Sequence, residues 1–380
     1  MSNAKAKPKI IVVGAGPAGS SFAYTLARSM SAEVLLLDKS SYPRVKVCGS
    51  GLSPHALELL KRMELIECFA RRHGEIKGLV ARGPSGKDVS VRGGGKGAWV
   101  VPRVEFDNIL CREAMHCGVQ MRENVKVIDV LENANGVCGV KTTDEEIEGD
   151  LVIFANGSPS RFSDDPRPRN GIRTIMGWWK DTHLPMDEAI MAWDERLEGY
   201  YAWSFPELDG TVNVGLTIPE EASAAKQLKQ LFSDILDEHF GIGLQGAEQI
   251  GKWMGHPATV TTRIGDLGDH RRVFIGEAAR LVSPGTVEGI SFAMESGILA
   301  AEAVSRHFDP ATGFSMAGQR KYKRALQTKM IPKFLAGEAF VRVMNSRLGR
   351  RVGAQLFGGP VNHFMSRAIV TVLGEKGARA

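Results

Sequence analysis

The residues with the clearest chemistry are three glycines near the N-terminus and an acid that follows them. Gly14, Gly16 and Gly19 have the spacing G-x-G-x-x-G between two short apolar runs, and Asp38 ends the second run. In a dinucleotide-binding βαβ unit, these glycines permit a tight turn, the approach of a pyrophosphate, and close packing of helix on strand. An acid at the position of Asp38 accepts hydrogen bonds from ribose hydroxyls. The predicted dinucleotide site also includes Pro17, Ala18 and Lys39.

A cysteine in the loop beyond Asp38 is the second candidate. Cys48 follows two cationic residues, Arg44 and Lys46, and precedes Gly49. A nearby cation or helix N-terminus favours the thiolate form of a cysteine. A small buried side chain would explain the same residue. The spacing therefore leaves both interpretations open.

Three aromatic residues form the third candidate. Tyr201, Trp203 and Phe205 alternate along a predicted strand that Pro206 interrupts. Alternation places the three rings on one face of the strand. Such a wall of rings is often the core of a sheet, and it can also line a ligand cavity.

Apolar runs and turn residues predict the elements that position these groups. Strands are expected at 10–13, 34–37, 150–155 and 272–276, and helices at 101–116 and from about 290. A hairpin turn is expected at Asn135-Gly136. An antiparallel sheet is expected over 172–260, interrupted by a helix near 222–239. The segment 241–246 also fits the glycine motif. It follows a helix-like segment and lacks a second strand ending in an acid, so we reject it as a phosphate site.

Composition restricts the class of protein. The chain has 380 residues, of which 43% are hydrophobic and 24% charged, as expected for a globular protein with two or three sub-domains. No long apolar run is present and the N-terminus is polar, which predicts a cytoplasmic protein. The 5 cysteines form no paired metal spacing, which predicts reduced thiols and no metal site.

The end of the chain is basic. Between residues 320 and 379 the cations far outnumber the two acids, Glu338 and Glu375, and apolar residues are interleaved with them. This pattern predicts amphipathic helices, with the cations either on a solvated face or on a surface for an anionic membrane or acidic ligand. The segment lacks an aromatic or helix-turn-helix signature, which argues against nucleic acid as a partner.

Two motifs resemble those of the flavin-dependent geranylgeranyl reductase family. The loop KVCGSGLSP is similar to that family's Lys-x-Cys-Gly-Gly-like loop, with Ser50 where a second glycine is usual, and YAWSFP matches its Tyr-x-Trp-x-Phe-Pro motif. Over residues 9–304 the chain also resembles the wider superfamily of p-hydroxybenzoate hydroxylase-type FAD enzymes, which includes flavin halogenases. The resemblance therefore implies FAD, rather than NAD, as the occupant of the dinucleotide site.

The resemblance also assigns roles to single residues. Arg103 would contact the flavin, although an exposed charge at a helix start would also explain it. The acid after Gly276 would hold the ribitol chain, but here it is Glu277 instead of aspartate. Asn156 likewise replaces the aspartate of a fingerprint that touches FAD and the nicotinamide donor. The implied cofactor contacts further include Arg44, Cys48, Gly49, Val127, and Gly289 and Ile290 at a helix N-terminus facing the flavin.

The implied fold is α/β, or α+β overall. It consists of a Rossmann-type FAD-binding domain (1–75, 101–171 and 256–308), an inserted antiparallel substrate sheet (76–100 and 172–255) and a basic C-terminal helical region (309–380).

The implied activity is reduction of carbon–carbon double bonds in an isoprenoid chain by hydride transfer from reduced flavin. NADPH or NADH would act as a transient reductant, and the substrate would be a prenyl lipid lying on the rings of Tyr201, Trp203 and Phe205. Cys48 would orient the substrate or relay a proton, and the basic C-terminal region would contact the membrane peripherally. The alternatives are a monooxygenase or halogenase that acts on an aromatic or lipid-like substrate through a C4a-hydroperoxide, and a non-catalytic flavin- or lipid-binding module.

Overall fold

The computed structural model describes residues 7–83, 88–92, 97–158, 160–163, 171–222, 225–265 and 267–346. A five-stranded parallel sheet of order β18-β12-β1-β2-β8 carries the glycine motif. Its strands are β1 (Lys9–Val13), β2 (Glu33–Leu37), β8 (Gln120–Arg122), β12 (Leu151–Phe154) and β18 (Arg272–Phe274). The predicted Rossmann-type unit is therefore confirmed.

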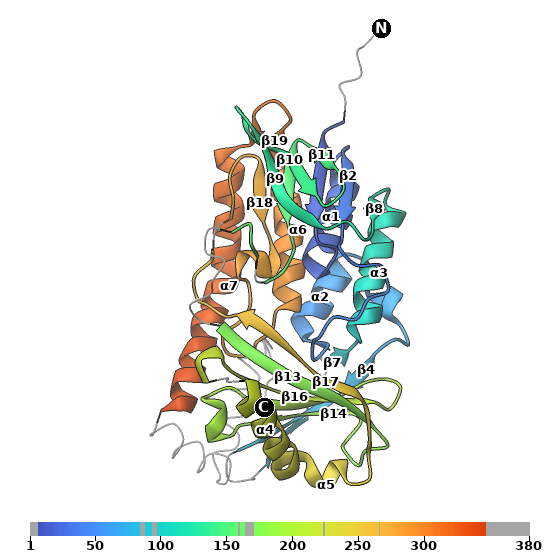
Figure 1. The fold of residues 1–380 in the computed structure, drawn as a ribbon, viewed down its shortest axis with the longest axis vertical. Coiled ribbons are helices and arrows are strands. Elements are labelled where there is room, and N and C mark those ends of the chain that lie inside the picture. The colour runs from blue at the N-terminus through green and yellow to red at the C-terminus, as the bar shows by residue number, and fades with distance from the viewer. Residues whose placement is uncertain are drawn as a thin grey trace.

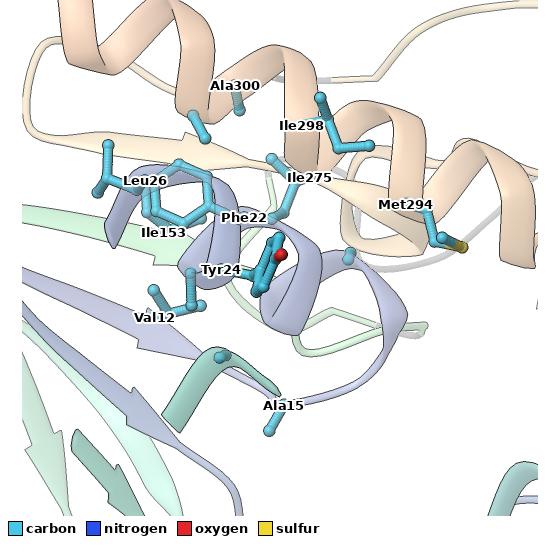
Figure 2. Close-up of a cluster of buried hydrophobic side chains, with 14 of the residues drawn as sticks. Val12, Ala15, Phe22, Tyr24, Leu26, Ile153, Ile275, Met294, Ile298 and Ala300 are labelled. Carbon is cyan, nitrogen blue, oxygen red and sulfur yellow. The ribbon is translucent and has the colours of Figure 1, made fainter. Parts of the chain in front are cut away.

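Helix α1 (Pro17–Ser29) lies between this sheet and α6 (Ile290–His307), and their side chains form one buried cluster (Figure 2). Gly297 of α6 is required for this contact, since a Cβ atom there would lie 2.4 Å from the backbone oxygen of Ala18. Helix α3 (Arg103–His116) packs against α1 as well. The core of this part is formed by apolar strands with helices packed closely against them.

A hairpin of β9 (Val127–Asn133) and β10 (Gly136–Thr142) turns at Asn135-Gly136 as predicted, and β11 (Glu146–Glu148) completes this small sheet. A second small sheet joins β3 (Gly51–Leu52), β7 (Ala98–Val100) and β4 (Gly74–Ile76). Helix α2 (Pro54–Arg62) follows β3, and the hydroxyl of its N-cap Ser53 accepts a hydrogen bond from the backbone N–H of Ala56.

The largest sheet has the order β17-β13-β16-β15-β14-β5-β6. Its strands are β5 (Gly78–Arg82), β6 (Asp88–Arg92), β13 (Gly171–Lys180), β14 (Glu188–Ala192), β15 (Ala202–Pro206), β16 (Val212–Pro219) and β17 (Glu248–Thr259). Adjacent strands are antiparallel except β5 and β14, which are parallel.

Helix α4 (Ala225–Ile235) packs on one face of this sheet and continues into a π-helical turn (Leu236–Phe240) and the short helix α5 (Gly241–Leu244). The segment 241–246 thus begins within helical structure and does not follow a strand. This placement agrees with our rejection of it as a phosphate site. The remaining short elements are 3₁₀ turns at Ile66–Phe69, Glu195–Leu197, Glu220–Ala222 and Gly276–Ala279, and the strands β19 (Phe308–Asp309) and β20 (Gly313–Phe314).

Helix α7 (Met316–Asn345) runs along one side of the molecule, from the parallel sheet to the large sheet (Figure 1). Tyr322 and Phe334 are buried in the core around the parallel sheet, whereas Phe340 and Met344 pack against the aromatic residues of the large sheet. The first part of the basic region is therefore one long helix that connects the two parts. Residues 347–380 lie outside the described part of the chain. None of the described helices combines the length and apolar character needed to span a membrane.

Candidate functional site: a glycine loop facing an aromatic wall

The glycine loop has the geometry that the motif predicts. Gly14 has a φ of +103°, and a Cβ atom there would lie 2.5 Å from the backbone oxygen of Ala155. A Cβ atom at Gly19 would lie 1.9 Å from the backbone oxygen of Gly14. Gly16 differs, since its Cβ position has only the Arg44 guanidinium nearby, at 3.7 Å. The side of the loop that would receive a pyrophosphate therefore has space and a cation, and the α1 N-terminus beside it has no side-chain cap.

Asp38 lies at the end of β2 and is nearly buried. Its Oδ2 atom accepts hydrogen bonds from the Ala15 N–H (2.9 Å) and the Tyr42 hydroxyl (3.2 Å), and its Oδ1 atom accepts one from the Ser40 N–H (3.0 Å). A carboxylate offers about four acceptor positions, so these bonds fix Asp38 and leave acceptor capacity for a ribose hydroxyl. Val125, two residues before Val127, donates its N–H to the Asp38 backbone oxygen at 2.9 Å. This bond brings the start of β9 beside the predicted ribose site.

Arg44 and Arg103 meet at an acid that sequence reasoning missed. Asp107 is 1% exposed and accepts two hydrogen bonds from Arg103, both at 2.7 Å. Arg44 Nη1 lies 3.2 Å from the Asp107 carboxylate. Burial opposes the charge of Arg103, but the ion pair with Asp107 outweighs it and raises the pKa of the guanidinium. The reading of Arg103 as an exposed charge is therefore wrong. The i, i+4 spacing of Arg103 and Asp107 was the available signal.

A buried oxygen atom of Glu277 indicates that this site can hold FAD. The Glu277 Oε1 atom is buried and has no hydrogen-bond partner among the residues that the structure describes, although the side chain is only partly buried as a whole. Burial raises the pKa of this carboxyl to about 7, while Lys46 and Arg103 act to lower it. A buried acceptor without a donor costs free energy unless a ligand supplies one. Glu277 follows Gly276 at the end of β18, so this orphan atom lies where the resemblance places the ribitol hydroxyls.

The N-terminus of α6 lies beyond this turn. Its N-cap residue, Gly289, provides no side-chain cap, and Ile290 begins an 18-residue helix. The positive end of a helix dipole stabilises a nearby negative charge. Together with the glycine loop and the orphaned Glu277 oxygen, this helix end gives a set of groups that fits a flavin dinucleotide.

The Cys48 loop packs directly on the aromatic wall. A Cβ atom at Gly49 would lie 3.1 Å from Trp203 Nε1 and 3.2 Å from Phe205 Cδ2. Gly51 approaches the Phe205 ring in the same way, at 3.4 Å. Cys48 packs against the core around the parallel sheet, and its neighbour Val47 packs against the aromatic cluster. The structure thus brings the predicted cofactor residues and the predicted substrate residues together at this loop.

The wall has the alternation that the sequence predicts. The rings of Tyr201 and Trp203 lie 6.3 Å apart and those of Trp203 and Phe205 6.1 Å apart, while Ala202 belongs to the cluster on the opposite face. Trp203 donates its indole N–H to Asn213 Oδ1 at 2.7 Å, and Tyr201 donates its hydroxyl to the Thr286 backbone oxygen. Tyr201 and Trp203 are therefore held rigidly in a buried cluster, and the ring of Phe205 is partly exposed.

Sequence reasoning did not find the partners of this wall. They come from distant parts of the chain and include Met176, Met191, Trp193, Phe340 and Met344. Methionine and aromatic residues together form an adaptable apolar surface. The two from α7 show that the C-terminal helix contributes to this site, which no local pattern indicated.

Comparisons with known proteins agree with this geometry. The family model of the FAD binding domain matches residues 7–203. The menaquinone reductase of Mycolicibacterium smegmatis is 28% identical over 78% of this chain and 76% of its own. Digeranylgeranylglycerophospholipid reductase 2 of Methanopyrus kandleri is 25% identical over 89% of this chain and 88% of its own.

Two solved structures share the fold. A geranylgeranyl bacteriochlorophyll reductase-like protein from Thermoplasma acidophilum superposes with a TM-score of 0.85 at 21% identity, covering 97% of this chain and 96% of its own. A flavin-dependent brominase superposes with a TM-score of 0.78 at 20% identity, covering 96% and 93%. The predicted fold and the resemblance to geranylgeranyl reductases within the hydroxylase-type superfamily are confirmed. With the family model matching more than half of its length, the chain belongs to the FAD binding domain family of flavin-dependent oxidoreductases.

Proposed function

We propose that this protein reduces carbon–carbon double bonds in an isoprenoid chain with electrons from bound FAD. The observation that carries the proposal is the contact between the Cys48 loop and the aromatic wall, in which the Gly49 backbone lies against Trp203 and Phe205. This contact joins the residues proposed for FAD to an apolar surface that suits a hydrocarbon chain. A relative named for a lipid with geranylgeranyl chains, aligned over 89% of this chain, supports the same substrate class.

The cofactor would be held by residues of both the glycine loop and α6. The α1 N-terminus and Arg44 would bind the pyrophosphate, Asp38 a ribose hydroxyl, and Glu277 the ribitol chain. The proposed contacts also comprise Pro17, Ala18, Lys39, Cys48, Gly49, Arg103, Val127, Gly289 and Ile290. Reduced FAD, when bound, supplies the hydride for the alkene.

The chain's own residues would orient the alkene and provide the proton. The rings of Tyr201, Trp203 and Phe205 would hold the isoprenoid chain and exclude water. Cys48 precedes Gly49, whose backbone lies against Trp203 and Phe205, so its thiol is proposed to orient the substrate or pass a proton to it. A Cys48→Ala protein should keep FAD and lose most alkene reduction, whereas full turnover would remove Cys48 from the mechanism.

The electron donor is proposed to be NADPH or NADH acting transiently. Among the described residues, one glycine-rich βαβ unit is present, and FAD is proposed to occupy it. A nicotinamide donor would therefore have to visit a shared groove. Bleaching of the flavin absorbance by NADPH or NADH under anaerobic conditions, compared with dithionite, tests this donor.

Product analysis separates the proposal from its rival. The protein with reduced FAD is incubated with a lipid that carries geranylgeranyl chains, first without oxygen and then with oxygen and bromide, and the lipid is analysed by mass spectrometry. We expect anaerobic gain of two hydrogen atoms per double bond. An oxygen-dependent gain of oxygen or bromine, with no anaerobic product, would contradict the proposal and favour the monooxygenase or halogenase, for which the brominase-like fold is the supporting observation.

Peripheral membrane contact stays a prediction. Arg320, Lys321, Lys323 and Arg324 are exposed on α7, and none forms an ion pair with another described residue. Each cation near an anionic membrane contributes about 1 kcal/mol, and salt weakens the attraction. Co-sedimentation with phosphatidylserine vesicles at low but not high salt would support this contact, and no sedimentation at low salt would exclude it.

A further inference from the structure

A hydrogen bond connects the Cys48 loop to the far edge of the large sheet. Lys46 Nζ lies 2.9 Å from His256 Nε2, although the two residues are 210 positions apart. His256 is on β17, and its backbone oxygen accepts a hydrogen bond from the Thr174 hydroxyl at 3.1 Å. Burial and the nearby cations Lys46 and Arg103 lower the pKa of His256 to about 4. At neutral pH the imidazole is therefore neutral, and its Nε2 atom accepts the hydrogen bond from the Lys46 ammonium.

Lys46 differs from the neighbouring cations Arg44 and Arg103, which are both paired with carboxylates. Arg103 is paired with Asp107, and Arg44 lies against both Asp107 and Asp38. Lys46 has no carboxylate within ion-pair distance among the described residues. The acid that acts on it most is Glu277, which is itself only weakly acidic because burial raises its pKa to about 7. Burial lowers the pKa of Lys46, and Glu277 opposes that shift. When Lys46 is protonated, its charge has a neutral imidazole as its direct partner.

A cation in this position has a use in a flavin site. Two-electron reduction of FAD takes up two electrons and one proton from the reductant and solvent, so the anionic reduced form carries one more negative charge than the oxidised form. In a partly buried site, a nearby positive charge stabilises that form far more than it would in water. Lys46 lies two residues before Cys48 in the same loop, and the charges of Glu277 and Arg103, both proposed to contact the flavin, act on it.

We infer that Lys46, held in place by His256, is the counter-ion that stabilises the reduced, anionic form of the bound FAD. Lys46 is then the residue that tunes the reduction potential, and His256 is its positioning residue. The inference requires that FAD bind, and it does not depend on the isoprenoid substrate. It applies equally if the protein proves to be a monooxygenase.

The test is the midpoint potential of the bound FAD, measured by anaerobic titration against a reference dye. For Lys46→Met we expect the protein to bind reduced FAD at least tenfold more weakly, relative to oxidised FAD, than the wild type does. This change corresponds to a midpoint potential about 30 mV more negative for a two-electron couple. Lys46→Arg keeps the charge and should stay within about threefold of the wild-type ratio. Lys61→Met, an exposed lysine on α2, is the matched control and should change nothing.

The positioning role of His256 has its own variants. His256→Leu removes the acceptor and should make the midpoint potential more negative by a smaller amount, with binding of reduced relative to oxidised FAD weakened about threefold. His256→Gln keeps an acceptor and should have the wild-type midpoint potential. An unchanged midpoint in Lys46→Met with FAD bound would overturn the inference. If Lys46→Met does not retain FAD, an unchanged midpoint in His256→Leu overturns it, and a lowered midpoint supports it.

Discussion

The two surfaces that meet at the Cys48 loop are built in different ways. On the FAD side, the glycine loop is determined by backbone contacts at Gly14 and Gly19 that are so close that no side chain fits at these two positions. On the other side, the wall of Tyr201, Trp203 and Phe205 consists of side chains that are held by hydrogen bonds and by residues from distant strands and α7. Gly14 and Gly19 of the first surface therefore tolerate no larger residue. Substitutions in the second surface can change the shape of the wall, and with it the ligand that fits there, while the fold is kept.

The largest expected effect is on the backbone side of this comparison. Gly14→Ala should destabilise the protein by about 4 kcal/mol and abolish FAD binding, because it adds a clash with Ala155 to an unfavourable positive φ. Gly118→Ala has a similar φ of +92° but no atom within 4 Å, and should cost only about 1 kcal/mol. Thermal unfolding and retained flavin absorbance measure both. Equal behaviour of the two variants would show that the contact with Ala155 is unimportant.

The contact between the two surfaces is tested next. Gly49→Ala should retain FAD but lose alkene reduction at least tenfold, since the new methyl group would displace Trp203 or Phe205 by a few tenths of an ångström and near-attack geometry is sensitive to such shifts. Gly51→Ala makes only an ordinary contact with Phe205 at 3.4 Å and should lose less. Steady-state turnover of both variants measures these two losses of activity. Full activity in Gly49→Ala would show that the contact between the Cys48 loop and the aromatic wall does not position the substrate.

Acid stability tests the helices that support the FAD side. Glu295 of α6 is 2% exposed and is bound by His55 at 3.1 Å and Lys329 at 2.8 Å. Burial opposes its charge, but these partners outweigh burial and lower its pKa to about 2. Because the folded pKa is lower than the unfolded one, this contribution is full above about pH 4.5 and is lost as pH falls towards 2.

The contribution of ionised Glu295 to the free energy of unfolding is on the order of 2–3 kcal/mol. Glu295→Gln should therefore flatten the loss of unfolding free energy over this range, measured by urea unfolding at several pH values. A variant with the same acid dependence as the wild type would assign that dependence to other carboxylates.

The smallest expected effect concerns the residue that departs from the family's loop. Ser50 has a φ of 62°, a conformation that glycine adopts without strain. Ser50→Gly should be neutral or should stabilise the protein by less than about 1 kcal/mol, since relief of strain is offset by greater freedom of the unfolded chain. Thermal unfolding measures this change. A clear loss of stability would indicate that the Ser50 hydroxyl has a role in holding the loop.

What could be predicted from the sequence follows the same division. The glycine motif, Asp38 and the hairpin at Asn135-Gly136 were predictable because each depends on a local steric rule. The alternation in YAWSFP predicted correctly which rings share a face. In contrast, the bond between Lys46 and His256 depends on two segments 210 positions apart, and no local pattern predicts it.

Two further parts of the site were only partly or not at all visible in local patterns. The i, i+4 spacing indicated a pair of Arg103 and Asp107, but the burial of Asp107 and its contact with Arg44 depend on tertiary packing. The basic pattern after residue 320 indicated helices but gave no reason to place Phe340 and Met344 beside the aromatic wall. Such contacts depend on how long elements cross, and that is determined by the packing of the whole molecule.

The most direct test of the account is a single turnover without oxygen. Protein with fully reduced FAD is mixed anaerobically with a lipid carrying geranylgeranyl chains, and the flavin absorbance is followed. We predict that the flavin is reoxidised and that one double bond is saturated for each flavin reoxidised. Flavin that stays reduced until oxygen is admitted, with the lipid unchanged, would contradict the claim that FAD and an isoprenoid chain meet between the Cys48 loop and the aromatic wall.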